Sequence, residues 1–80
     1  MNVKILGTGC PTCQKMYKIV NDFIAREKLD AEVEYVKDIQ SIMSYGVMST
    51  PALVINGKVS MVGFQGAAKI EQALLQGAAV

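Results

Sequence analysis

The chain of 80 residues contains no tryptophan and no histidine, and it has only two cysteines and two prolines. Without histidine or a third cysteine, the sequence has too few ligands for the tetrahedral four-ligand site that structural zinc requires. No apolar run approaches the roughly 20 residues that a helix needs to span a bilayer. The formal net charge is only +1 and no basic stripe is present, so the sequence does not indicate binding to nucleic acid or to a membrane surface.

About half of the residues, 51%, are apolar, which is enough for a compact core without disulfide or metal staples. We therefore predict one domain that covers residues 1–80. The residues from Met1 to Lys4 lack the charged start and apolar centre of a signal peptide. This favours a cytoplasmic protein, in a compartment where closely spaced cysteines are more often catalytic than structural. We also expect a monomer.

Both cysteines lie in the segment Gly7-Thr8-Gly9-Cys10-Pro11-Thr12-Cys13, where a strand-like run changes to a helix-like run. Pro11 suits the first helical turn, because proline has no amide hydrogen to lose there and its φ angle is already helical. Cys10 should therefore lie at or next to the N-cap, where free backbone N–H groups and the helix dipole lower the pKa of its thiol. Cys13, one turn later, is within reach of a disulfide to Cys10. The segment is predicted to be a redox site.

Other interpretations of the cysteine pair stay open at this point. A structural bridge from Cys10 to Cys13 would close a very short loop, which stabilises a fold poorly in the chain-entropy account. The two residues could also be unrelated buried cysteines. A third alternative is a carrier of Cu(I), because two thiolates can hold this soft metal and heavy-metal-binding domains carry a CxxC after their first strand. A further alternative is an inactive adaptor, which the presence of both cysteines disfavours.

Hydrophobic periodicity and turn signals divide the chain into seven predicted elements. Strands are expected over residues 2–6, 32–36, 52–55 and 59–62. Helices are expected from Pro11 to about Lys28, from an Asp38 N-cap to near Gly46, and, after a turn over residues 63–66, from Ala67 to a frayed end that starts at Gly77. The apolar helix faces and gap-filling methionines predict a core, and the predicted core residues include Met16, Tyr17, Ile39, Ile42, Met43, Met61, Ala67, Ile70, Ala73 and Leu74. Met48 is expected near the redox site.

The predicted order of elements is β-α-β-α-β-β-α. The first two strands should be parallel, because a strand–helix–strand unit almost always crosses over right-handed between parallel strands. The last two strands should be antiparallel, because Asn56-Gly57 is a strong hairpin signal. We therefore predict an α/β fold with a four-stranded mixed sheet flanked by helices. This order differs from the β-α-β-β-α-β order of heavy-metal-binding domains, which disfavours the Cu(I) carrier.

The motif Gly9-Cys10-Pro11-Thr12-Cys13, with Ser49-Thr50-Pro51-Ala52 before the third strand, resembles the thioredoxin/glutaredoxin superfamily. Within it, the chain is most similar to the small glutaredoxin-sized thioredoxins, also called redox-active disulfide proteins. The resemblance implies a minimal thioredoxin-like fold in which Cys10 attacks a substrate disulfide and Cys13 resolves the mixed disulfide. It also implies a cis Thr50–Pro51 bond that faces the cysteines. The residues expected to shape the site and contact the substrate are Gly9, Pro11, Thr12, Thr50 and Pro51.

The resemblance also bears on the electron donor. Glutaredoxins commonly carry a lysine shortly before their motif, and a Gly-Gly pair with an aspartate after the fourth strand, for binding glutathione. This chain has Gly7-Thr8-Gly9 and Gly63-Phe64-Gln65-Gly66 at these places. We therefore expect a thiol–disulfide oxidoreductase without an organic cofactor or metal. It should reduce disulfide-containing client proteins and take electrons from a thioredoxin reductase rather than from glutathione.

Overall fold

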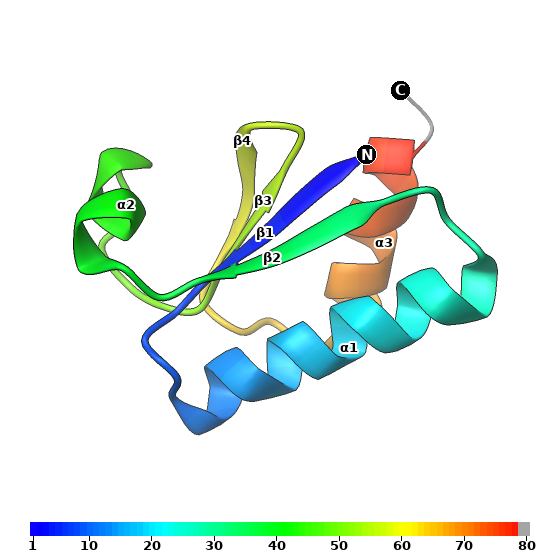
Figure 1. Cartoon of the computed structure of the whole chain (residues 1–80). Coiled ribbons are helices and arrows are strands. Elements are labelled where there is room, and N and C mark those ends of the chain that lie inside the picture. Colours follow the sequence, from blue (N-terminus) through cyan, green and yellow to red (C-terminus); the bar gives the residue numbers. More distant parts are fainter. Residues whose placement is uncertain (79–80) are drawn as a thin grey trace.

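The computed structural model describes residues 1–78, whose elements follow the predicted order (Figure 1). The elements are β1 (Asn2–Leu6), α1 (Pro11–Glu27), β2 (Glu32–Val36), α2 (Ile39–Ser44), β3 (Ala52–Ile55), β4 (Lys58–Val62) and α3 (Ala67–Ala78). The helix α3 continues through Gly77 and Ala78. The frayed end predicted from Gly77 is therefore wrong for these two residues, and positions 79 and 80 lie outside the described residues.

The strands form one mixed sheet in the order β2-β1-β3-β4. The central strand β1 pairs in parallel with β2 and antiparallel with β3, and β3 pairs antiparallel with β4. The β3–β4 turn consists of Asn56 and Gly57, whose φ angles of 53° and 83° lie in the left-handed region that these two residue types tolerate. The predicted α/β fold with a four-stranded mixed sheet is confirmed.

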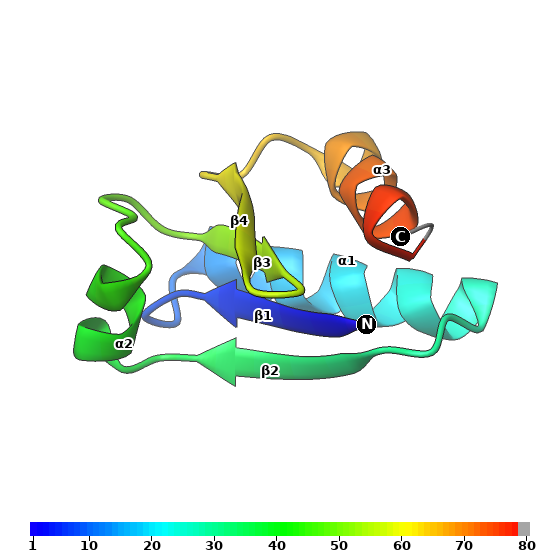
Figure 2. The ribbon, with the colours of Figure 1, turned by 90° about the horizontal axis from the view of Figure 1, so that it is seen from above.

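The helices divide between the two faces of the sheet (Figures 1 and 2). On one face, α1 and α3 pack against each other and against the sheet. The buried cluster on that face comprises Val3, Ile5, Met16, Val20, Phe23, Leu53, Ile55, Met61, Ile70 and Leu74. On the other face, Ile42 of α2 belongs to a smaller cluster with Leu6, Val47, Ala52 and Val54. Strand β3 contributes to both clusters, which explains its unbroken apolar sequence.

Some residues predicted for the core lie at the surface instead. Ile39 and Met43 are 61% and 66% exposed, because the short α2 buries only Ile42. Ala67, at the start of α3, is also exposed. Tyr17 is 37% exposed and packs edge-on against the ring of Tyr35, with the ring centroids 5.1 Å apart. The prediction that Met16 and Met61 are buried is confirmed.

Asp38 caps α2, as the sequence predicts. Its Oδ2 atom accepts hydrogen bonds from the backbone N–H and from the hydroxyl of Ser41, both at 2.9 Å. We expect Asp38→Ala to lower the free energy of unfolding by about 1 kcal/mol, because a free N–H of the helix loses its acceptor. Asp38→Asn keeps a side-chain oxygen and should lose less. Urea denaturation of the two variants measures this difference, and equal losses would contradict a role for the hydrogen bond.

Candidate active site

The two cysteines lie where the loop after β1 enters α1. Cys10 is the N-cap residue of α1, with an extended backbone (φ −66°, ψ 162°), and Pro11 takes the first helical position. The Sγ atom of Cys10 accepts a hydrogen bond from the backbone N–H of Cys13 at 3.2 Å. The sulfur therefore lies at the unpaired N–H groups and the positive dipole end of α1, where a negative charge on it is stabilised.

Cys10 and Cys13 form a disulfide, with their Cα atoms 5.0 Å apart. Their surroundings differ. Cys10 is half-buried, the exposed residues Pro11 and Thr12 follow it, and the Thr12 hydroxyl lies 3.4 Å from its sulfur. Cys13 is fully buried on the inner face of α1. Cys10 is consequently the cysteine that a second molecule can approach, while Cys13 lies behind it.

The segment before β3 forms a second wall near the helix start. Because Leu6 pairs with Ala52, the end of β1 lies next to the beginning of β3. The Thr50–Pro51 bond is cis, the isomer that the resemblance implies, and Pro51 is fully buried. The carbonyl of Pro51 accepts a hydrogen bond from the N–H of Gly63 at 2.7 Å, which fixes the loop after β4 to this wall. Figures 1 and 2 show the α1 start and the α2–β3 connection at the same end of the sheet.

An apolar hollow of about 270 Å³ adjoins this wall. Thr8 and Thr50 line it together with Ile39, Ile42, Met43, Val47, Met48 and Ser49. Met48, which the sequence predicts near the redox site, is almost fully exposed and lines this hollow with Thr8 and Thr50. The exposed apolar side chains of α2 therefore continue the surface that begins at Thr8 and Thr50.

On the opposite side of the helix start, Gly7 separates β1 from Cys13. A Cβ atom at Gly7 would lie 2.6 Å from Sγ of Cys13, 2.8 Å from its Cβ and 3.5 Å from the hydroxyl oxygen of Tyr35. Contacts to Cys13 this short cannot be accommodated without movement, so only glycine allows α1 to approach the sheet here. The structure thus brings Gly7, Cys13 and Tyr35 together.

A second hollow, of about 350 Å³, lies beside these residues and is lined by Gly9, Gln14, Tyr17, Tyr35 and Lys37. The Nζ atom of Lys37 lies 5.4 Å from the centroid of the Tyr35 ring. Sequence reasoning missed Tyr35 and Lys37, because alternation along β2 identifies an inward side chain without showing which helix residue it meets. The register that pairs Tyr35 with Ile5 places the Tyr35 side chain on the face of the sheet that α1 covers.

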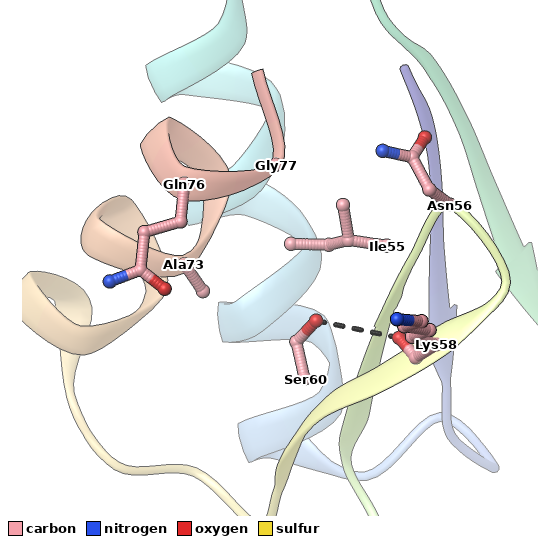
Figure 3. A pocket seen from close by; sticks show the side chains of 7 residues that line it. All are labelled: Ile55, Asn56, Lys58, Ser60, Ala73, Gln76 and Gly77. Carbon is pink, nitrogen blue, oxygen red and sulfur yellow. Dashed lines mark hydrogen bonds between the residues drawn. The ribbon is translucent and has the colours of Figure 1, made fainter. Parts of the chain in front are cut away.

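A larger hollow, of about 530 Å³, lies between the β3–β4 hairpin and α3 (Figure 3). Figure 3 shows Ile55 pointing toward α3, and the Ser60 hydroxyl donates to the carbonyl of Lys58 at 3.4 Å. Because Ile55 pairs with Val3, this hollow lies at the end of the sheet remote from the cysteines. It contains none of the predicted site residues, so cavity size does not locate the site.

The described part of the chain also bears on two other kinds of site. Residues 1–78 contain no group of three or more His, Cys, Asp or Glu side chains placed to hold a metal ion. Over the same residues, every helix is too short or too polar to cross a membrane. The chemistry that the site does offer is the reversible opening of one disulfide at a helix start.

Comparisons with known proteins match most of the chain. The sequence model of the family described as "Thioredoxin domain" matches residues 1–75. Thioredoxin of Methanothermobacter thermautotrophicus is 32% identical over 63 residues, which cover 79% of this chain and 82% of that protein. One thioredoxin of Methanocaldococcus jannaschii is 41% identical over 58 residues, or 68% of this chain and 67% of the relative. Another from that organism is 32% identical over 65 residues, or 75% and 76%.

Proposed function

Because the chain belongs to the thioredoxin family and is a thiol–disulfide oxidoreductase, we propose that it reduces client-protein disulfides through a Cys10–Cys13 dithiol–disulfide cycle. The observation that carries this proposal is the asymmetry of the cysteine pair. Cys10 caps α1 and is partly accessible, whereas Cys13 is bonded to it from the buried side. Sγ of Cys10 can therefore contact a client disulfide while Sγ of Cys13 remains close enough to attack Cys10 in the next step.

In the first step, the Cys10 thiolate attacks one sulfur of the client disulfide. A mixed disulfide forms, and the other client sulfur leaves as a thiolate. In the second step, Cys13 loses its proton to solvent and attacks Sγ of Cys10, so the remaining client sulfur leaves and the Cys10–Cys13 disulfide forms. Two electrons pass to the client. A reductase must return two electrons to the disulfide before the next cycle.

Gly9, Pro11, Thr12 and Thr50 are proposed to form the surface that contacts the client, and the buried Pro51 is proposed to shape that surface from below. Pro51 has no N–H, so Thr50 is the residue of this pair whose backbone can pair with an extended client segment. Such main-chain pairing suits clients of many sequences. The family match over residues 1–75 supports our proposal that residues 1–80 form one thioredoxin-like domain, which we expect to act as a monomer.

The electron donor is expected to be a flavoprotein thioredoxin reductase. Glutathione brings two carboxylates, and Lys37 is the only cation among the residues that line the hollow beside Gly9. Each hydrogen bond to a charged group that is missing should weaken the binding of glutathione on the order of tenfold. NADPH-coupled reduction of the chain through thioredoxin reductase should therefore be at least about tenfold faster than reduction through glutathione and glutathione reductase. Both assays use the oxidised chain and follow NADPH absorbance. Faster reduction through glutathione would contradict the expectation.

The arrangement of elements supports the oxidoreductase over the Cu(I) carrier. A helix, α2, lies between β2 and β3, and α3 follows β4, unlike the β-α-β-β-α-β order of heavy-metal-binding domains. A thiol count before and after treatment with dithiothreitol, together with a Cu(I) titration, distinguishes the two functions. A carrier would bind Cu(I) tightly as the dithiol without passing electrons to a client disulfide.

A further inference from the structure

The hydroxyl of Tyr35 is a buried polar group that has no role in the Cys10–Cys13 dithiol–disulfide cycle described above. Its oxygen is inaccessible to solvent, and it has no hydrogen-bond partner among residues 1–78. A buried hydroxyl without a partner is unfavourable, and native proteins contain few of them. The position of this hydroxyl next to the reacting disulfide offers an explanation.

Tyr35 and Cys13 both border the place that a side chain of Gly7 would occupy. A Cβ atom there would lie 2.6 Å from Sγ of Cys13 and 3.5 Å from Oη of Tyr35, so both atoms border the same point. The pairing of Tyr35 with Ile5 and the edge-on packing of its ring on Tyr17 hold the side chain against α1. The hydroxyl and the sulfur of Cys13 therefore both lie next to Gly7, between the sheet and α1.

The other groups around this point are neutral or cationic. Lys37, which follows β2, places its Nζ 5.4 Å from the Tyr35 ring centroid, and Tyr17 is the neighbour of that ring on α1. On the far side of the helix start, Lys15 places its Nζ 5.3 Å from the Phe64 ring. None of the residues that line the hollow at Tyr35 is acidic. No carboxylate there competes for the Tyr35 hydroxyl or repels a negative sulfur.

We propose that Tyr35 is a positioning residue for the second step of exchange, in which its hydroxyl donates a hydrogen bond to the Cys13 thiolate. In the disulfide form the bond to Cys10 holds the sulfur of Cys13, and the Tyr35 hydroxyl makes no hydrogen bond to it. Once a mixed disulfide on Cys10 frees Cys13, the thiolate gains a charge-assisted hydrogen bond. This inference rests on the proposed function and assigns a residue to its second half.

The bonds and charges of this step balance without a further reactant. Cys13 gives its proton to solvent and attacks Sγ of Cys10. The new sulfur–sulfur bond forms as the bond from Cys10 to the client breaks, and the client sulfur leaves with the electron pair. The hydroxyl of Tyr35 keeps its proton throughout, because it only donates a hydrogen bond to the attacking thiolate.

The test uses the reduced full-length chain and an equimolar amount of the symmetric aromatic disulfide of thionitrobenzoate. Attack by Cys10 releases the first coloured thionitrobenzoate, and resolution by Cys13 releases the second. We expect Tyr35→Phe to leave the first release unchanged and to slow the second about three- to fourfold near neutral pH, because a thiol pKa higher by about one unit lowers the thiolate fraction but partly compensates through a more nucleophilic sulfur. Tyr17→Phe, which removes the hydroxyl of the neighbouring ring, is the matched control and should change neither release.

A pH profile distinguishes hydrogen bonding from a change in packing. In the Cys10→Ser background, the ultraviolet absorbance of the Cys13 thiolate against pH gives the pKa of its thiol, and Tyr35→Phe should raise that pKa by about one unit. An unchanged second release with an unchanged profile overturns the proposal, and so does an equal shift in Tyr17→Phe. If the unsubstituted chain fails to give the first release, the proposed function itself fails. The two failures are therefore distinguishable.

Discussion

Cys10→Ser is expected to abolish the reduction of protein disulfides, lowering the rate by at least about a thousandfold, as for the loss of other enzymatic nucleophiles. A serine hydroxyl is not ionised near neutral pH, and only a thiolate attacks a disulfide at a useful rate. Cys13 cannot replace Cys10, because it is fully buried behind the helix start. Release of free thiols from insulin by the reduced protein measures the loss.

Cys13→Ser is the matched variant and should behave differently. It keeps the accessible nucleophile but loses the intramolecular attack that frees the client, so mixed disulfides on Cys10 should accumulate. Non-reducing gel electrophoresis after incubation with a disulfide-containing protein detects them. Cys10→Ser should form almost none. If Cys10→Ser accumulates the mixed disulfides and Cys13→Ser does not, the assignment of the two roles is reversed.

Gly7→Ala is expected to lower the free energy of unfolding by about 1–3 kcal/mol and to slow disulfide exchange, because it overfills a closely packed contact. The new methyl group would lie 2.6 Å from Sγ and 2.8 Å from Cβ of Cys13. These atoms belong to the first turn of α1, so relief of the clash has to move the helix start and its cysteines relative to β1. Urea denaturation measures the first effect, and insulin reduction under folding conditions measures the second.

Gly77→Ala serves as the control for lost stability alone. Its Cβ would lie 2.5 Å from Cγ2 of Ile55, a comparable clash, but at the end of the sheet remote from the cysteines. The better helix propensity of alanine, about 1 kcal/mol over glycine, offsets part of this clash. We expect some loss of stability with an unchanged rate of exchange. If both glycine variants slow exchange equally, the effect of Gly7→Ala does not come from the site.

Short sequence signals made much of the fold and of the site predictable. Pro11 after Cys10 marks a helix start, Asn56-Gly57 marks a hairpin, and Asp38 marks a cap, and the structure has all three. Each signal acts within a few residues, because it depends on backbone angles or on one short hydrogen bond. The cysteine pair could be assigned to a helix start from sequence for the same reason.

The remaining features depend on contacts between distant segments. Periodicity placed Ile39 and Met43 on the apolar face of a predicted helix, but it could not show that the six-residue α2 buries only Ile42. The place of Tyr35 beside Cys13 follows from the register of β2 on β1 and from the close approach of α1 at Gly7. Composition suggested fraying from Gly77, whereas close packing on Ile55 gives this glycine a place in α3.

The central position of β1 has a consequence for the order of events during synthesis. The ribosome makes β1 before either of its neighbours, and its antiparallel partner β3 follows some fifty residues later along the chain. The inner side chains of α1, such as Met16 and Phe23, pack in one cluster with Leu53 of β3 and with Ile70 of α3. The inner face of α1, which also carries the buried Cys13, therefore gains these packing partners only after β3 and α3 have been translated.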